Sequence, residues 1–276
     1  MEPLLILGIL AFSVFAGGLG AMLGLGGGIF MIIFFMLVLN IPAHQAVALS
    51  LLAVIASSSM AGSVYIKDKM TNLKLAMIIE TCAVTGAVSG ALVALILPVI
   101  FIEVALGMIL IYAAIIMYLG RKSENIVSAT EGMTVKGEYY DPCSNRTIGY
   151  CAVRLKTGLF MSLIGGAVSG IVGIGGGVIM VPIMNMIMKI PSKASAATSN
   201  FMVGVTAAAS SFIFFNKGFV DLYFAVPTVV GIMFGAYIGT RMIGKVESST
   251  FRKLLSAVLT FAAFLLILKA GGILSW

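Results

Sequence analysis

A five-residue glycine motif occurs twice in this sequence. Gly-Leu-Gly-Gly-Gly begins at Gly24, and Gly-Ile-Gly-Gly-Gly begins at Gly173, 149 residues later. The same offset, without a gap, aligns Pro42 with Pro191 and holds as far as residue 90. A single register over about 70 residues indicates an internal duplication. We therefore expect two copies of one structural unit, each built around a glycine break.

The composition is that of a membrane protein. Of the 276 residues, 61% are hydrophobic and 10% are charged, and the mean hydropathy is +1.15. A soluble domain carries about a quarter charged residues. Several apolar runs reach about 20 residues, which is long enough for helices that span a bilayer and too long for barrel strands. The composition therefore predicts an all-α polytopic membrane protein.

Ten apolar segments divide the chain, five in each half. They are 4–23, 29–39, 44–66, 73–97 and 100–119, then 155–172, 178–188, 194–215, 221–243 and 251–269. The second segment of each half is short, because eleven residues make only about 17 Å of helix. Each short helix either crosses the membrane obliquely or forms a re-entrant hairpin with the helix before it. We expect a first membrane repeat at 1–120, a linker at 121–154 and a second repeat at 155–276.

The positive charges predict the orientation in the membrane. With this segment count, 15 of the 17 Lys and Arg residues fall on one side, and only Lys217 and Lys269 fall on the other. Positive charge next to spans marks the cytoplasmic side. Both termini are therefore predicted outside and 121–154 in the cytoplasm. An odd number of segments per repeat makes the two halves inverted relative to each other.

The cytoplasmic linker contains two β-prone runs, 134–140 and 147–153. Asp141-Pro142 between them is a turn signal. We expect a small β-hairpin, with a plain linker as the alternative.

The glycine breaks are the first candidate binding site. Consecutive glycines unwind a helix, and backbone groups freed inside a membrane are tolerated only where they line a cavity or meet protein. The next helix starts at the last glycine of each motif, so its positive dipole end points into the break and favours an anion. Inverted repeats bring two such breaks toward the midplane. The alternative is that the glycines only allow close helix packing. The expected substrate-binding glycines are Gly26, Gly27, Gly28, Gly175, Gly176 and Gly177.

Polar side chains on the third segment of each half are the second group of candidates. Ser50 matches Ser199 by the repeat, Ser57 matches Thr206, and Asn200 follows Ser199. Polar groups inside a span face protein or a water-filled cavity. We expect Ser50, Ser57, Ser199 and Asn200 to donate hydrogen bonds to a small oxyanion. Hydrogen bonding between helices is the alternative.

Glu80 is the only carboxylate well inside a predicted span, and its counterpart in the second half is Val229. A carboxylate inside the membrane is a candidate for carrying a coupling proton. The alternative is that Glu80 reaches Lys67, Lys69 or Lys74 at the membrane edge.

Other classes of function lack their motifs in this sequence. The three cysteines have no metal-site spacing, and the one histidine cannot form a histidine-based metal cluster. The glycine motifs are not phosphate-binding loops, because no Lys-Ser/Thr pair follows them. We expect no enzyme activity, no cofactor, no metal and no nucleic-acid partner. The expected partners are the lipid bilayer, a small anion and protons as a coupling ion, and the oligomeric state stays open.

The second motif in its surroundings, Gly-Ile-Val-Gly-Ile-Gly-Gly-Gly-Val-Ile-Met-Val-Pro from Gly170 to Pro182, resembles the TauE/SafE sulfite exporter family, also called the toluene sulfonate uptake permease family. The similarity covers about residues 5–270. In such proteins a proline often follows both glycine motifs. This chain has Ile33 at the matched position of the first half, which predicts a differently shaped first break.

The resemblance implies a secondary transporter of small sulfur-containing anions such as sulfite, thiosulfate, sulfoacetate or other organosulfonates. The absence of an ATP-binding motif leaves an ion gradient as the energy source. A passive anion channel and a membrane assembly factor without transport activity are the alternatives.

Overall fold

The computed structural model describes residues 3–119, 135–141, 146–242, 260 and 263–266. In the first half the helices are α1 (Pro3–Leu23), α2 (Gly28–Ile33), α3 (Ala43–Lys67), α4 (Leu73–Ala94) and α5 (Val99–Leu119). In the second half they are α6 (Leu155–Val172), α7 (Gly177–Pro182), α8 (Ser192–Asn216) and α9 (Leu222–Met242). The two short helices continue as π-helical turns, η1 (Phe34–Val38) and η2 (Ile183–Ile187). The strands are β1 (Val135–Asp141) and β2 (Arg146–Ala152).

The helical prediction is confirmed. Seven of the described helices are long and apolar enough to cross a membrane. Two shorter apolar helices, Gly28–Val38 and Gly177–Ile187, correspond to the two short predicted segments. Together they account for the nine predicted segments that the structure covers. The tenth predicted segment, 251–269, lies largely outside the described residues. The predicted β-hairpin is also present, as an antiparallel pair in which Val135 lies opposite Ala152.

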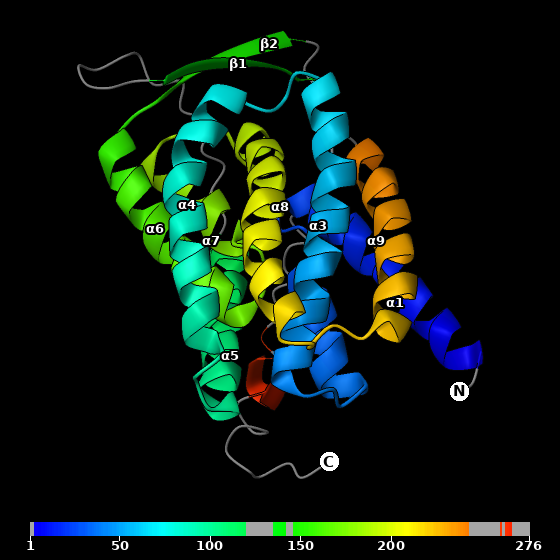
Figure 1. Ribbon diagram of the computed structural model, residues 1–276. Helices are drawn as coiled ribbons and strands as arrows, with labels where there is room; N and C mark the ends of the chain where they lie inside the picture. Colours follow the sequence, from blue (N-terminus) through cyan, green and yellow to red (C-terminus); the bar gives the residue numbers. More distant parts are fainter. Residues whose placement is uncertain (1–2, 120–134, 142–145, 243–259, 261–262, 267–276) are drawn as a thin grey trace.

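The helices of the two halves pack on each other rather than forming two separate bundles. α1 packs on α9, and α4 packs on α6. In the repeat, α1 corresponds to α6 and α9 corresponds to α4, so these two pairs are equivalent to each other. α3 and α8, which correspond to each other, make the third large contact and lie at the centre of the bundle (Figure 1). The core is therefore built between the halves.

Glycines allow the backbones of these pairs to approach closely. A Cβ atom on Gly86 or Gly90 of α4 would overlap a carbonyl oxygen of α6, and one on Gly235 or Gly239 of α9 would overlap a carbonyl oxygen of α1. These glycines match each other across the repeat. Their role is the close helix packing that small residues permit in a membrane.

The two glycine breaks have the same backbone shape. φ is +75° at Gly27 and +88° at Gly176, and each of these residues precedes a six-residue helix that becomes a π-helical turn. The expectation that Ile33 in place of a proline gives the first break a different shape is wrong. A proline is not needed for this shape, because the π-helical turns begin at matched residues after Ile33 in the first half and after Pro182 in the second.

The second break forms a hairpin that returns to the end of the bundle where it started. The Val153 N–H, just before α6, donates to the carbonyl of Met188, just after η2, at 3.1 Å. The start of α6 and the end of η2 are therefore neighbours. The break between them reverses the chain inside the bundle.

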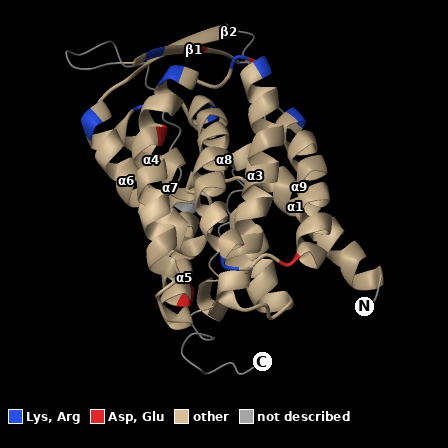
Figure 2. Cartoon of the chain, viewed as in Figure 1, with Lys and Arg blue, Asp and Glu red and all other residues tan. Residues whose placement is uncertain are grey.

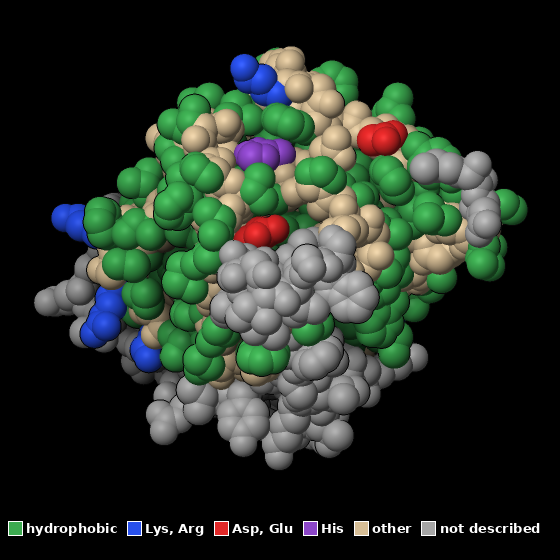
Figure 3. Space-filling view, turned by 90° about the horizontal axis from the view of Figure 1, so that it is seen from below, with side chains coloured by type: hydrophobic (Ala, Val, Ile, Leu, Met, Phe, Trp, Pro, Cys, Tyr) green, Lys and Arg blue, Asp and Glu red, His purple; other side chains and the backbone are tan. Residues whose placement is uncertain are grey.

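Figure 1 shows the α3–α4 connection at the hairpin end of the molecule and the matched α8–α9 connection at the other end. This placement is what inverted repeats require, and the inversion across a membrane stays a prediction. Lys and Arg gather at the hairpin end (Figure 2). Among the described residues, the side chains at the opposite end are mostly hydrophobic (Figure 3). There His44 lies 3.1 Å from the Ala94 carbonyl oxygen and stacks on Phe219.

The β-hairpin packs on the second half and on the α3–α4 connection. Its inner residues Tyr139 and Tyr150 share a buried cluster with Met188 and Leu75. A Cβ atom on Gly137 would overlap the side chain of Asn72, the N-cap of α4. Burial raises the pKa of Tyr150, so this hydroxyl stays neutral. The hairpin is thus part of the folded core at this end.

Candidate functional site

The two glycine breaks meet at the centre of the molecule. A Cβ atom on Gly177 would overlap the carbonyl oxygen of Gly24 and lie 2.8 Å from the Cα of Leu25. One on Gly28 would lie 3.6 Å from the carbonyl oxygen of Ile174. Backbone therefore touches backbone, and only residues without side chains permit this approach.

Two matched valines pack into the point where the breaks meet. Val54 of α3 lies 3.0 Å from the Cβ position of Gly26 and 2.5 Å from that of Gly175. Val203 of α8 lies 3.2 Å from the Cβ position of Gly26. Both valines are fully buried. The crossing of α3 and α8 thus forms one wall of the candidate site.

Gly27 and Gly176 differ in the space around them. A Cβ atom on Gly27 would lie 3.0 Å from the Ala16 carbonyl oxygen and from a methyl of Ile232. One on Gly176 would lie 3.5 Å from Ser169, an ordinary contact distance. Both residues have a left-handed φ that a residue with a side chain rarely adopts. The second break therefore has more room than the first.

Ser50 and Ser199 each bond to the break of the opposite half. The Ser50 hydroxyl donates to the Gly173 carbonyl at 2.7 Å, and the Ser199 hydroxyl donates to the Gly24 carbonyl at 2.8 Å. Both serines are fully buried. The structure therefore brings these two predicted site residues directly to the breaks.

Asn200 holds the end of α1 just before the first break. Its amide nitrogen donates to the Ala21 carbonyl at 2.8 Å and to the Ala196 carbonyl at 3.1 Å. The Tyr65 hydroxyl donates to the same Ala21 carbonyl at 3.0 Å. Asn200 Oδ1 is buried and has no hydrogen-bond partner among the described residues. Its free atom is thus an acceptor, which does not bind an anion directly.

Ser57 and Thr206 occupy matched positions and behave differently. The Thr206 hydroxyl donates to Met202 O at 2.9 Å and lies 3.3 Å from Gly175 O in the second break. The Ser57 hydroxyl is fully buried, and no group in the described part of the chain bonds to it. A free hydroxyl at this depth is a donor available to a ligand.

Glu80 is buried between α4 and α8, beside Thr206. Neither carboxyl oxygen has a hydrogen-bond partner within the described ranges, so Glu80 does not bond to Lys67, Lys69 or Lys74. The alternative in which Glu80 reaches one of these lysines is therefore not supported by a hydrogen bond among the described residues. A buried carboxyl group without a partner is costly, and such groups are common at functional sites.

No positive side chain is placed at the breaks in the described part of the chain. Arg241, in the last turn of α9, bonds to the Tyr237 hydroxyl at 3.1 Å and is exposed. An anion held between the breaks would therefore rely on backbone N–H groups and neutral donors. Backbone N–H groups at helix starts can do this without a buried cation.

Comparison with known proteins identifies the family. The chain matches the family described as Sulfite exporter TauE/SafE over residues 9–266. This chain belongs to the TauE/SafE family. It is 28% identical to the "Probable membrane transporter protein YunE" of Bacillus subtilis, over 91% of this chain and 93% of that protein. It is 27% identical to the "Probable membrane transporter protein MJ0441" of Methanocaldococcus jannaschii, over 96% and 95%. No solved structure matches.

Membership in the TauE/SafE family makes the chain a multi-pass membrane transporter and not an enzyme. The resemblance noted from the glycine motif is confirmed. The family name refers to sulfite, and it leaves open which anion this chain carries.

Sequence reasoning missed Tyr65 and the valine pair at the site. Tyr65 is hard to find because its matched residue is the apolar Phe214. Val54 and Val203 are both valine and lie 149 residues apart, so the repeat pairs them. Valine is common in membrane helices, however, so this match alone does not indicate a site. Their role depends on the crossing of two helices, which no local pattern shows.

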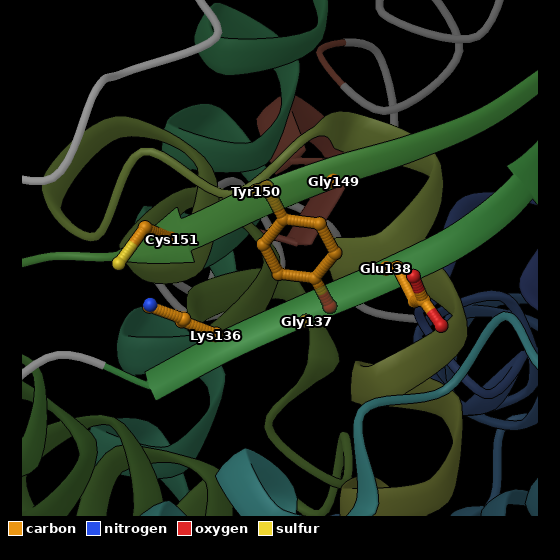
Figure 4. A pocket seen from close by; sticks show the side chains of 6 residues that line it. All are labelled: Lys136, Gly137, Glu138, Gly149, Tyr150 and Cys151. Atoms are coloured by element: carbon orange, nitrogen blue, oxygen red, sulfur yellow. The ribbon is translucent and has the colours of Figure 1, made fainter.

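A separate hollow of about 470 Å³ lies on the β-hairpin, away from the breaks. Figure 4 shows the ring of Tyr150 between the side chains of Lys136 and Glu138. Its lining residues are Lys136, Gly137, Glu138, Gly149, Tyr150 and Cys151. The hollow is open to solvent and carries charges of both signs, so it is not selective for an anion.

Proposed function

We propose that this protein is a secondary transporter that moves a small sulfur-containing anion across the cell membrane, coupled to an ion gradient. The candidate substrates are sulfite, thiosulfate, sulfoacetate and other organosulfonates. The observation that carries the proposal is the contact between the two breaks, Gly177 against Gly24, at the centre of one bundle. Two helix starts that meet there offer backbone N–H groups to one anion from two sides.

In this proposal the anion binds at the backbone of Gly26, Gly27 and Gly28 and of Gly175, Gly176 and Gly177. The Gly26 N–H already donates to the Gly20 carbonyl at 3.3 Å, so the donors offered by the first break are those of Gly27 and Gly28. The Ser57 hydroxyl, which has no hydrogen-bond partner among the described residues, supplies an additional donor. Asn200 contributes by holding the end of α1 rather than by direct contact. A neutral site of this kind releases its anion more easily than one built around a buried arginine, which suits a transporter.

Glu80 is the proposed carrier of the coupling proton. It lies beside Thr206, whose hydroxyl is 3.3 Å from the carbonyl of Gly175 in the second break. A carboxylate and an anion repel each other strongly in a medium of low dielectric constant. Binding of the anion therefore favours uptake of a proton by Glu80, and the two move together.

Transport by the purified protein in liposomes tests the proposal. Uptake of a panel of sulfur anions is measured with and without a pH gradient. We expect saturable uptake of at least one anion, driven by the gradient. Flux that does not saturate and ignores the gradient would indicate a passive channel. No flux for any anion would favour an assembly factor.

Leucine substitutions locate the site. Gly27→Leu and Gly176→Leu should each abolish transport and anion binding, since a side chain fills the break and cannot easily adopt the left-handed φ. Binding is measured by calorimetry on folded, detergent-solubilised protein. The control is Gly8→Leu in α1, where a Cβ meets no atom within 4 Å. Normal affinity in both break variants would mean that these glycines only pack helices.

A further inference from the structure

Two hydrogen bonds at the centre of the molecule cross between the halves. Ser50 in the first half bonds to Gly173 in the second, and Ser199 in the second half bonds to Gly24 in the first. The two serines match each other across the repeat, as do the two glycines. Each half therefore holds the first residue of the other half's break.

These bonds satisfy carbonyl groups that the breaks leave open. Gly24 and Gly173 directly follow the last residues of α1 and α6, where the carbonyl groups of a helix have no partner within it. An unsatisfied carbonyl away from water is destabilising. Both serines are fully buried, so the hydroxyl groups take the place that water has at a helix end on a surface.

We propose that Ser50 and Ser199 are positioning residues for transport, each fixing the backbone path of the opposite half's glycine break. The proposal rests on the proposed function, and it assigns these serines a role other than direct contact with the anion. A hydroxyl has one hydrogen to donate. While that hydrogen is donated to a glycine carbonyl it does not reach a substrate, so the serines act through the breaks.

The crossed arrangement links the two halves mechanically. α3 carries Ser50 and α8 carries Ser199, and these helices pack on each other at the centre of the bundle. A displacement of α8 therefore pulls on the first break, and a displacement of α3 pulls on the second. Alternating access in a repeat transporter requires one part to move against the other around a central site. Both breaks would then respond to the same displacement.

The two bonds are unequal. Ser50 Oγ also lies 2.8 Å from the carbonyl of Val47 in its own helix, so one hydrogen serves two acceptors. The Ser199 hydroxyl bonds to Gly24 alone among the described residues. We therefore expect removal of the Ser199 hydroxyl to have the larger effect.

Hydrogen–deuterium exchange of the purified protein tests the crossed bonds directly. Ser199→Ala should raise deuterium uptake at residues 24–28, and Ser50→Ala should raise it at 173–177, by roughly tenfold in rate for the loss of one buried hydrogen bond. In each variant, deuterium uptake should change less at the glycine break in the half that carries the substituted serine. Ser162→Ala is the matched control, because within the described part of the chain this buried serine bonds only in its own helix, to the Gly158 carbonyl.

Transport kinetics distinguish positioning from direct binding. Both alanine variants should lower the maximal rate, and saturating anion should not restore it. If the serines contact the anion, uptake is instead restored at high concentration and exchange at the opposite break is unchanged; that result overturns the proposal. Ser199→Cys, with a similar size and a weaker donor, should act in the same direction if the alanine variant does not fold. If the wild-type protein carries no anion, the proposed function fails and the exchange experiment still tests the bonds.

Discussion

At the scale of single residues, the proposed proton carrier is a departure from the internal repeat. Most of the buried centre repeats: Val54 matches Val203, Ser50 matches Ser199, and the φ angles of the breaks agree. Glu80 does not repeat, because its counterpart is Val229. The Glu80 carboxyl lies beside Thr206, next to the second break, whereas the residue at the matched position, Val229, has no carboxyl group. A proton carrier beside only one of two similar breaks would make the two halves functionally different, as the proposed role of Glu80 implies.

Glu80→Gln should abolish transport driven by a pH gradient and leave anion exchange in the absence of a gradient intact. The amide has nearly the same shape, but it cannot take up and release a proton. Both activities are measured in liposomes. Glu138→Gln on the exposed face of β1 is the control and should leave both unchanged. Gradient-driven uptake that survives in the Glu80 variant would make this residue structural.

At the scale of elements, the glycines divide into two classes with different roles. Those in α4 and α9 lie where backbones of neighbouring helices touch, and those in the breaks lie where helices end. Pro182 shows a similar contrast. It sits at the last residue of α7, yet the same π-helical turn follows α2, which ends at Ile33. Contacts between elements, more than the identity of a single residue, decide the local backbone.

Gly86→Leu should destabilise the protein, because its side chain would collide with the backbone of α6 at Leu163. Overpacking of a core commonly costs about 1–3 kcal/mol, and a clash with backbone places this variant at or above that range. The thermal unfolding temperature in detergent should fall. Gly149→Ala on the hairpin, where a Cβ meets no atom within 4 Å, should leave it unchanged. An unaltered unfolding temperature for Gly86→Leu would mean that α4 and α6 do not pack as described.

At the scale of the whole molecule, the charges distinguish the two ends. Lys136, Arg154, Lys156 and Lys189 are exposed at or near the hairpin end, whereas Lys217 lies in the α8–α9 connection at the other end. Positive charge at span ends favours the cytoplasm. The hairpin end is therefore the proposed cytoplasmic end.

Labelling with a membrane-impermeant maleimide on intact cells tests this orientation. In a protein whose three native cysteines are replaced by alanine, Lys217→Cys should react from outside and Lys136→Cys should react only after the membrane is opened. Both positions are exposed. The opposite pattern would reverse the orientation and place the hairpin outside the cell.

The features that depend on local pattern could be predicted from the amino-acid sequence. Composition predicted a helical membrane protein, the repeat offset predicted matched elements, and β-prone runs around Pro142 predicted the hairpin. These predictions succeed because hydrophobic length, a glycine run and a turn signal act on the neighbouring backbone. The candidate glycines and serines could be named for the same reason, since the repeat marks them twice.

How the two halves fit together could not be predicted from local sequence and required the folded structure. The bonds from Ser50 to Gly173 and from Ser199 to Gly24 join residues 123 and 175 positions apart. Each sequence neighbourhood is equally compatible with a hydroxyl that faces its own helix, the other half or a ligand. The partner depends on which helix faces cross, and packing between the two halves sets that geometry. For the same reason, the finding that the Ser57 hydroxyl and the Glu80 carboxyl have no hydrogen-bond partner among the described residues required the neighbouring helices to be in place.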